Sequence, residues 1–231
     1  MDRAIKVSKV KVCAGARATT ISAVEAPRLW GYIEPWKTSS FARSIKVVGP
    51  AGVGKATSIG CMLFKYGGIP MDIMEVFQRD GITKYDQVPA KLAALKVVPT
   101  FDIPKYHISI LDSSSDKKAD CTILITSPDK LLENVNNDMK STMAIQESDK
   151  IIILLNKMDM YDWSEEQFRR SKKEILDYLI SLGKDITRVV IVPVSSTGGD
   201  NYIGTSLKSS WYVENSKPSA TVLDALTSVL A

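Results

Sequence analysis

The chain has 231 residues, of which 45% are hydrophobic and 24% charged, a composition typical of a globular protein with a sizeable buried core. No apolar run approaches the ~20 residues that a membrane-spanning helix needs, so we expect no membrane association. The net charge of +4 permits an RNA or phosphate-rich partner without requiring one. The sequence has a single histidine, His107, which excludes histidine-based catalytic triads and most zinc sites.

The three cysteines, Cys13, Cys61 and Cys121, lie far apart and have no metal-binding spacing. This pattern indicates buried thiols in a reducing compartment, and we expect the cytoplasm.

Residues 1–40 are interpreted as an N-terminal arm, and residues 41–231 as one domain. Within the arm, a short half-exposed strand is predicted from the apolar residues Ile5, Val7, Val10 and Val12. Its basic residues and few acids are compatible with a basic arm or a transit-like segment. The absence of a clear amphipathic helix argues against a transit peptide, so we favour a flexible or added arm.

A predicted strand at 44–48, a glycine-rich turn and a helix continuing through 59–64 follow one another directly. Gly49, Gly54 and Lys55 have the spacing G-x4-G-K. Glycines let backbone N–H groups curl around a phosphate, the helix N-terminus adds partial positive charge, and the lysine neutralises phosphate oxygens. We therefore predict a phosphate-binding loop, the alternative being a chance glycine turn.

The residue after the lysine departs from this motif. A serine or threonine there supplies a hydroxyl ligand to Mg²⁺, whereas Ala56 has no oxygen. Thr57 is adjacent, but one residue along a helix turns the side chain by about 100°, so Thr57 is a poor substitute.

Gly67 and Gly68 are predicted to end that helix, and further helical segments are predicted at 71–78 and 86–96. Strands at 97–103, which contains Thr100, and at 106–111 have a two-residue connection, which predicts an antiparallel hairpin.

The predicted strand at 121–125 follows Asp112 after only a short link, whereas a parallel crossover needs a dozen residues or more. Either an extended link crosses the sheet without a helix, or the strand order is unusual. Residues 130–147 have a polar helical pattern.

An unbroken apolar run at 151–155 predicts a central strand of a parallel sheet, covered on both faces. Ligands bind beyond the carboxyl ends of such strands. There, Asp159 could accept two hydrogen bonds from adjacent N–H donors of a purine, as guanine offers. Asn156 could tie neighbouring loops together or contact N7, and the stem of Lys157 could lie over the base. The alternative is a strand that ends in an ordinary polar turn.

The last third of the chain continues the alternation of helix and strand. Ser164 is the predicted N-cap of a helix that ends at Gly183. A last strand at 189–192 leads into a loop of serines and glycines, and a closing helix is predicted at 221–230.

Taken in order, these motifs resemble the GTP-binding domain of eukaryotic elongation factor 1-alpha and its relatives, the termination and ribosome-rescue GTPases. The resemblance runs from about Ser44 onwards and is carried by residues 48–60, 64–69, 105–112, 119–121, 156–159 and 163, with a tail at 192–195, 199–201, 211–212 and 223–226. It implies an α/β fold of three layers, a P-loop NTPase or Ras-like G domain. The central sheet would be mostly parallel, with one antiparallel edge hairpin and a missing switch helix.

The resemblance implies binding of GTP or GDP with Mg²⁺ by residues from several segments. The implied nucleotide-binding residues are Gly49, Gly52, Val53, Gly54, Lys55, Ala56, Thr57, Asn156, Lys157, Asp159, Ser195 and Ser196. The implied magnesium ligands are Asp112, through water, and Thr100, which matches the family's switch threonine.

The departures from the family concentrate in one segment. Family members have Asp-x-Pro-Gly-His where this chain has Asp112, three serines and Asp116. Ser115 replaces a glycine whose N–H meets the γ-phosphate, and Asp116 replaces the histidine that positions the attacking water. A carboxylate there would be repelled by the phosphate, so simple loss of catalysis is favoured over Asp116 as a replacement base. The helix that normally follows is missing, which raises the question of an exposed apolar sheet face.

We therefore expect a guanine-nucleotide-binding domain with weak or absent GTP hydrolysis, weakened Mg²⁺ binding and no assigned catalytic residue. Whether the chain is an enzyme stays open. The alternatives are a pseudo-GTPase adaptor acting on ribosome or RNA-handling complexes without turnover, and a decayed paralogue without nucleotide function. Binding of aminoacyl-tRNA in the usual way is not expected, because the β-barrel domains that hold it are absent from the sequence.

Overall fold

The computed structural model describes residues 10–14, 17–21, 41–112, 115, 117–130, 139–215 and 220–231. Asp116, the residue at the family's catalytic position, lies outside the described residues, as does most of the N-terminal arm. Within the arm, β1 (Val10–Ala14) pairs antiparallel with β2 (Arg17–Ile21) in a separate two-stranded sheet. The predicted strand is therefore present from Val10 onwards.

The domain is built on a six-stranded sheet with the order β4-β5-β3-β6-β7-β8. Its strands are β3 (Phe41–Val48), β4 (Thr100–Ile103), β5 (Tyr106–Leu111), β6 (Cys121–Thr126), β7 (Ile151–Leu155) and β8 (Val190–Pro193). All neighbours pair in parallel except β4 and β5, the predicted antiparallel hairpin at the edge. The predicted mostly parallel sheet is thus confirmed.

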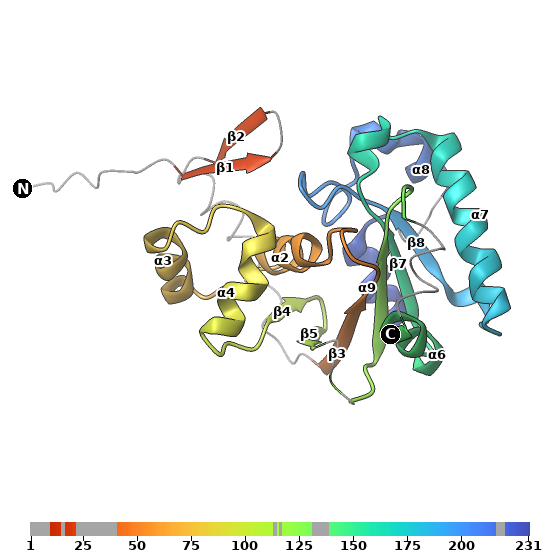
Figure 1. Cartoon of the computed structure of the whole chain (residues 1–231), viewed down its shortest axis with the longest axis horizontal. Coiled ribbons are helices and arrows are strands. Elements are labelled where there is room, and N and C mark those ends of the chain that lie inside the picture. Colours follow the sequence, from red (N-terminus) through yellow and green to blue (C-terminus); the bar gives the residue numbers. More distant parts are fainter. Residues whose placement is uncertain are drawn as a thin grey trace, which may run out of the picture.

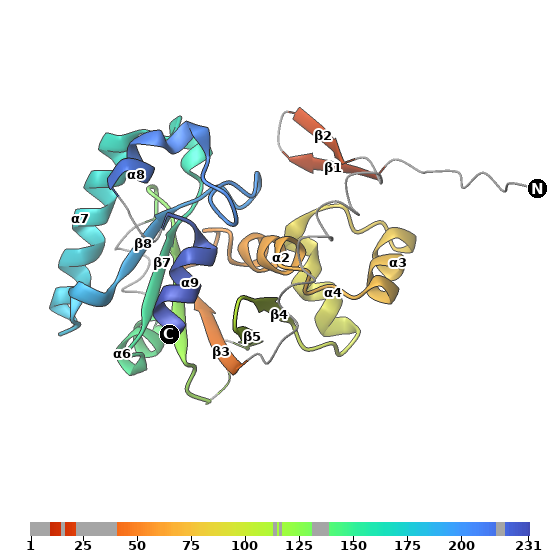
Figure 2. The ribbon, with the colours of Figure 1, turned by 180° about the vertical axis from the view of Figure 1, so that it is seen from behind.

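Helices lie on both faces of this sheet, which gives the predicted three layers. They are α2 (Lys55–Lys65), α3 (Met71–Arg79), η2 (Tyr85–Gln87), α4 (Val88–Ala94), α6 (Met139–Glu147), η3 (Met158–Tyr161), α7 (Glu165–Ser181), η4 (Ile186–Arg188), η5 (Leu207–Ser209), α8 (Ser210–Asn215) and α9 (Val222–Leu230). α6 packs beside α7 in front of the sheet in Figure 1, and α9 lies on the opposite face, which Figure 2 turns forward. No helix in the described part of the chain is long and apolar enough to span a membrane.

Local sequence signals explain where the helices begin and end. Ser164 caps α7 by accepting a hydrogen bond from the backbone N–H of Gln167, as predicted. Thr221 and Asp224 form a reciprocal capping box at the start of α9. Gly183 has φ +72° just past the end of α7, so the predicted glycine stop is confirmed.

The apolar run of β7 lies between β6 and β8, and every residue of β7 is buried. This is the setting predicted from its sequence, because a strand covered on both faces cannot alternate polar and apolar residues. β6 is buried along its whole length as well, so these two strands form the centre of the core.

The short link between β5 and β6 passes over β3, since both strands pair in parallel with β3. Its described residues, 112, 115 and 117–120, form no helix. Hydrogen bonds hold it: the Asp120 carboxylate accepts from the Ser44 N–H (2.7 Å) and hydroxyl (2.8 Å), and the buried Lys46 ammonium donates to the Ser115 carbonyl (2.9 Å). The first of the two sequence alternatives, an extended link without a helix, is therefore correct.

The outer face of the hairpin beside this link is mostly polar. Alternate residues of β5 are buried, and the outward ones are His107, Ser109 and Leu111, of which Leu111 alone is apolar. Asp102, opposite on β4, lies 2.8 Å from His107 Nδ1, and Ser44 lies opposite Ser109 on β3. Beside the described part of the link, the hairpin thus presents mainly polar side chains that water can solvate.

We expect Cys61 and Cys121 to resist thiol reagents while the chain is folded. Burial raises the pKa of each thiol to about 12, so only about one thiol in 10⁴ is ionised at pH 8, and both are fully buried. In a Cys13→Ser variant, DTNB should release colour slowly under native conditions and react with two thiols after unfolding in urea. Rapid reaction of either thiol in the folded protein would contradict this burial.

Candidate functional site

The glycine loop joins the carboxyl end of β3 to the first turn of α2, at the edge of the sheet that faces upwards in Figure 1. Gly49 has φ +145°, and a Cβ there would lie 2.1 Å from the carbonyl oxygen of Ile125. Gly54 has φ +93°, and a Cβ there would lie 2.5 Å from Asn156 Nδ2. Both motif glycines are therefore required by backbone conformation and by close neighbours.

Two lysines bring positive charge to this loop. Lys55 Nζ donates to the carbonyls of Gly49 and Pro50, the latter at 2.7 Å. Lys130, from the turn after β6, donates from Nζ to the Ala51 carbonyl at 2.9 Å. Lys55 was expected from its motif. Lys130 was not, because nothing in its sequence spacing shows that this turn reaches the glycine loop.

The first turn of α2 carries no hydroxyl at the expected magnesium position, Ala56. The adjacent hydroxyl, Thr57 Oγ1, lies 4.0 Å from where a Cβ on Gly54 would stand. Thr57 is thus directed towards the loop backbone.

Of the other predicted magnesium ligands, Asp112 directly follows β5 and Thr100 is the first residue of the neighbouring β4. Lys46 pairs with Leu111, so Asp112 follows β5 beside the strand that enters the glycine loop. Thr100 pairs with Ser109, three residues before Asp112, roughly 10 Å away along the sheet. Among the described residues there is no cluster of three or more His, Cys, Asp and Glu side chains suited to a metal.

Asn156 connects the glycine loop to the loop after β8. Its Nδ2 donates to the carbonyl of Val53 at 2.8 Å, and its Oδ1 accepts from the Ser196 N–H at 3.0 Å and the Ser196 hydroxyl at 2.8 Å. The side chain is 3% exposed. Of the two roles considered for Asn156, this structure shows the tie between loops.

Lys157 and Asp159 follow in the same turn. Lys157 has φ +65° and begins η3, and its Nζ lies 3.8 Å from the carboxylate of Asp129. Partial burial alone would raise the pKa of Asp129, but the nearby Ser127 hydroxyl and the positive charges of Lys157 and Lys130 lower it below its usual value. The Asp159 carboxylate is exposed at the carboxyl end of β7 and can reach a ligand there.

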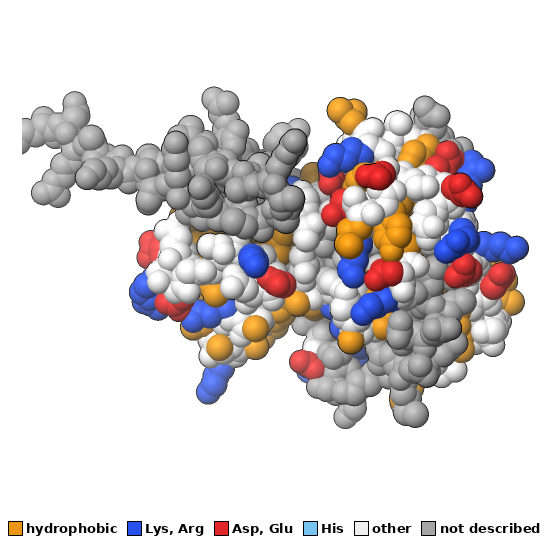
Figure 3. All heavy atoms as spheres, turned by 45° about the horizontal axis from the view of Figure 1, so that its top comes forward, with side chains coloured by type: hydrophobic (Ala, Val, Ile, Leu, Met, Phe, Trp, Pro, Cys, Tyr) orange, Lys and Arg blue, Asp and Glu red, His pale blue; other side chains and the backbone are white. Residues whose placement is uncertain are grey.

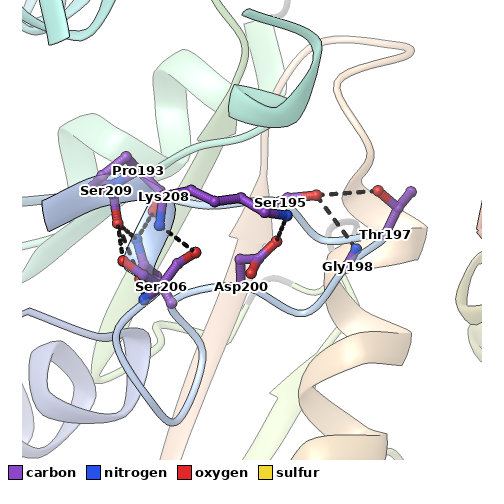
Figure 4. Close-up of polar contacts among 9 residues, drawn as sticks. Pro193, Ser195, Thr197, Gly198, Asp200, Ser206, Lys208 and Ser209 are labelled. Atoms are coloured by element: carbon purple, nitrogen blue, oxygen red, sulfur yellow. Dashed lines mark hydrogen bonds and ion pairs between the residues drawn. The ribbon is translucent and has the colours of Figure 1, made fainter. Parts of the chain in front are cut away.

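Ser195 and Ser196 are both buried, at 1% and 2% exposure. Ser195 Oγ lies 3.1 Å from Thr197 Oγ1 and accepts from the Gly198 N–H, as Figure 4 shows. Both side chains thus bond within the protein and hold the loop in shape. Their contact with a base stays a prediction.

The loop beyond these serines is held by Asn201, which is fully buried with φ +63°. Its Nδ2 donates to the carbonyl of Pro193 (2.9 Å) and to Ser209 Oγ (3.0 Å), and its Oδ1 accepts from the Ser206 N–H (2.6 Å). η5, which ends at Ser209, and α8 follow directly. The sequence patterns did not predict these two elements.

Charges of both signs surround this edge of the sheet. Figure 3, which brings the top of Figure 1 forward, shows basic and acidic side chains interspersed with apolar ones over the described surface. No single sign of charge dominates this view.

Comparison with known proteins agrees with this arrangement. No protein-family model matches the chain. It is 27% identical over 228 residues to elongation factor 1-alpha of Coccidioides immitis (strain RS), covering 80% of this chain and 49% of that protein. It is 28% identical over 204 residues to elongation factor 1-alpha of Blastobotrys adeninivorans, covering 73% and 44% respectively. The chain is therefore similar in sequence to elongation factor 1-alpha over about three quarters of its length or more.

Solved structures show the same fold. Sup35 complexed with GDP superposes with a TM-score of 0.61 at 22% identity, covering 84% of this chain and 46% of that one. The S. cerevisiae Ski7 GTPase-like domain, bound to GTP, superposes with a TM-score of 0.60 at 15% identity, covering 90% and 52%. The predicted P-loop G-domain fold is thus confirmed. The chain spans about half the length of the curated relatives it matches.

Removing the Asn156 side chain should destabilise the fold. Asn156→Ala leaves the Val53 carbonyl and the Ser196 N–H buried without partners, which we expect to cost about 2 to 4 kcal/mol in the free energy of unfolding. Urea denaturation gives the value. Gln146→Ala, which deletes an exposed amide on α6, is the matched control and should change stability by less than about 0.5 kcal/mol. Equal stabilities of the two variants would contradict the structural role of Asn156.

Proposed function

We propose that the chain is a guanine-nucleotide-binding domain that binds GTP or GDP and hydrolyses GTP weakly or not at all. The observation that carries the proposal is the Asn156 side chain, which joins the glycine loop to the loop after β8. A phosphate-binding loop and a base-binding loop need a fixed separation to hold one nucleotide, and this amide supports it.

Base recognition is assigned to the turn after β7. The exposed carboxylate of Asp159 offers two acceptor oxygens to the N1–H and exocyclic amine of guanine. Adenine has no pair of adjacent donors on that edge, so the same carboxylate disfavours it. The stem of Lys157 can lie along the base while its ammonium group stays near Asp129.

Phosphate binding is assigned to the glycine loop and the N-terminus of α2. Loop N–H groups and the helix N-terminus favour an anion, and Lys55 can transfer its hydrogen bonds from the loop carbonyls to phosphate oxygens. Lys130 adds a second positive charge beside the loop, which supports binding with little help from Mg²⁺.

Weak hydrolysis is proposed from three departures. Ala56 provides no oxygen for Mg²⁺, and Asp116 stands where the family has histidine. The described residues of the link after β5 form no helix and are tied to β3 through Ser44 and Lys46.

We also propose that the protein acts in the cytoplasm, with ribosome- or RNA-associated complexes as partners. Residues 41–231 are assigned to the nucleotide-binding domain and residues 1–40 to an appended arm.

Titration calorimetry with GDP, GTP and ATP tests nucleotide binding. We expect micromolar or tighter binding of GDP and GTP and at least 100-fold weaker binding of ATP. Asp159→Asn should weaken GDP and favour xanthosine diphosphate, because the new amide donates a hydrogen bond where xanthine has a carbonyl. Asp162→Asn, an equivalent change in the same turn, is the control and should leave the preference unchanged.

If the folded protein binds none of these nucleotides, the proposal is wrong and an adaptor role without nucleotide is left. Binding without base preference would remove the role assigned to Asp159.

Restoring the magnesium ligand gives a separate expectation. Ala56→Ser should tighten GTP binding several-fold in Mg²⁺, and the gain should disappear in EDTA, because the new hydroxyl acts only through the ion. Phosphate release should stay near background in both proteins, since the histidine position is not restored. Rapid turnover by the unaltered protein would contradict the proposed loss of hydrolysis.

A further inference from the structure

Four polar side chains meet inside the protein where α2 passes the loop after β8. Asn156 and Ser196 belong to the tie described above, Ser58 comes from α2, and Tyr202 follows the loop. Ser196 Oγ lies 2.6 Å from Ser58 Oγ and 2.8 Å from the Tyr202 hydroxyl. All four residues are at most 3% exposed, so these hydroxyl groups exchange hydrogen bonds with protein partners.

The chemistry of the groups sets the direction of every bond. Asn156 Nδ2 must face the Val53 carbonyl, because that carbonyl can only accept. Asn156 Oδ1 therefore accepts from the Ser196 hydroxyl, which uses the single proton of that hydroxyl. Ser58 and Tyr202 must then each donate to Ser196 Oγ, which has two lone pairs to receive them.

The environment of Tyr202 agrees with this direction. Burial raises the pKa of its phenol far above the usual value, so the phenol keeps its proton and serves as a donor. The ring is fully buried. Each hydroxyl in this series of hydrogen bonds thus polarises the next, and the series ends at the side-chain amide of Asn156.

We propose that Ser58, Ser196 and Tyr202 are positioning residues that fix Asn156 and the base-reading turn against the glycine loop, and so set selectivity for guanine. Ser58 lies three residues after Lys55 on α2, which connects the cluster to the phosphate-binding helix. Asp159 lies three residues after Asn156, in the turn that Asn156 anchors. The inference rests on the proposed nucleotide binding and adds residues that contact no ligand themselves.

The test compares GDP with inosine diphosphate, whose base lacks the exocyclic amine that Asp159 would bind. Tyr202→Phe and Ser58→Ala each remove one donor to Ser196, and Ser196→Ala removes the hydroxyl that bonds Asn156. We expect the ratio of GDP to inosine diphosphate affinity to fall about 3- to 10-fold in each variant, the effect of one lost hydrogen bond. Calorimetry gives the affinities, and thermal unfolding confirms that each variant is folded at the working temperature.

Tyr66→Phe is the matched control. It deletes a second buried tyrosine hydroxyl, which donates to the backbone carbonyl of Tyr202 at 2.9 Å. Among the described residues, the structure shows no hydrogen bond from this hydroxyl to Ser196 or Asn156. It should lower the unfolding temperature as Tyr202→Phe does and leave the affinity ratio unchanged. A fall in the ratio confined to the three cluster variants supports the proposal.

An unchanged ratio in folded Tyr202→Phe and Ser58→Ala would overturn the inference while nucleotide binding stands. The same fall in Tyr66→Phe would also overturn it, since general loosening would then explain the effect. If the unaltered protein binds neither diphosphate, the proposed function fails and this inference fails with it.

Discussion

The side-chain amide of Asn156 joins the glycine loop to the loop after β8. Its two ends are chemically different, and each meets a partner that suits only that end: a carbonyl at Val53 and an N–H at Ser196. The amide can sit there only because Gly54 has no side chain, since a Cβ would lie 2.5 Å from Nδ2. The glycine of the phosphate motif and the asparagine of the base motif are therefore parts of one packing arrangement.

A second constraint comes from the short link between β5 and β6. A short link without a helix covers little of a neighbouring strand, and in this structure polar contacts hold the described part of the link. Asp120 and Ser115 supply them by bonding Ser44 and Lys46 of β3. The hairpin beside the link presents Asp102 and His107 outwards, so polar side chains face water there.

Much of the fold was predictable because its signals are local. The apolar run of β7, the two-residue hairpin after Ile103 and the cap at Ser164 each depend on a few consecutive residues. The contacts of Lys130 and Tyr202 were not predictable, because they join side chains distant in sequence and carry no characteristic spacing. For the same reason the sequence placed Ser196 as a support for the base, whereas its hydroxyl bonds Asn156 inside the protein.

The two halves of the site are therefore supported differently. The base half of the proposed nucleotide site rests on buried hydrogen bonds that converge on Asn156. The phosphate half has Lys55 and Lys130 but no hydroxyl at Ala56, and the segment beside it is tied to β3 instead of being free to respond. A ligand shifts a conformational equilibrium only as far as its affinities for the two states differ. If the proposed function is correct, GTP and GDP would each favour the same conformation of the protein to a similar extent. A bound nucleotide would then stabilise one conformation and would not switch the protein between two.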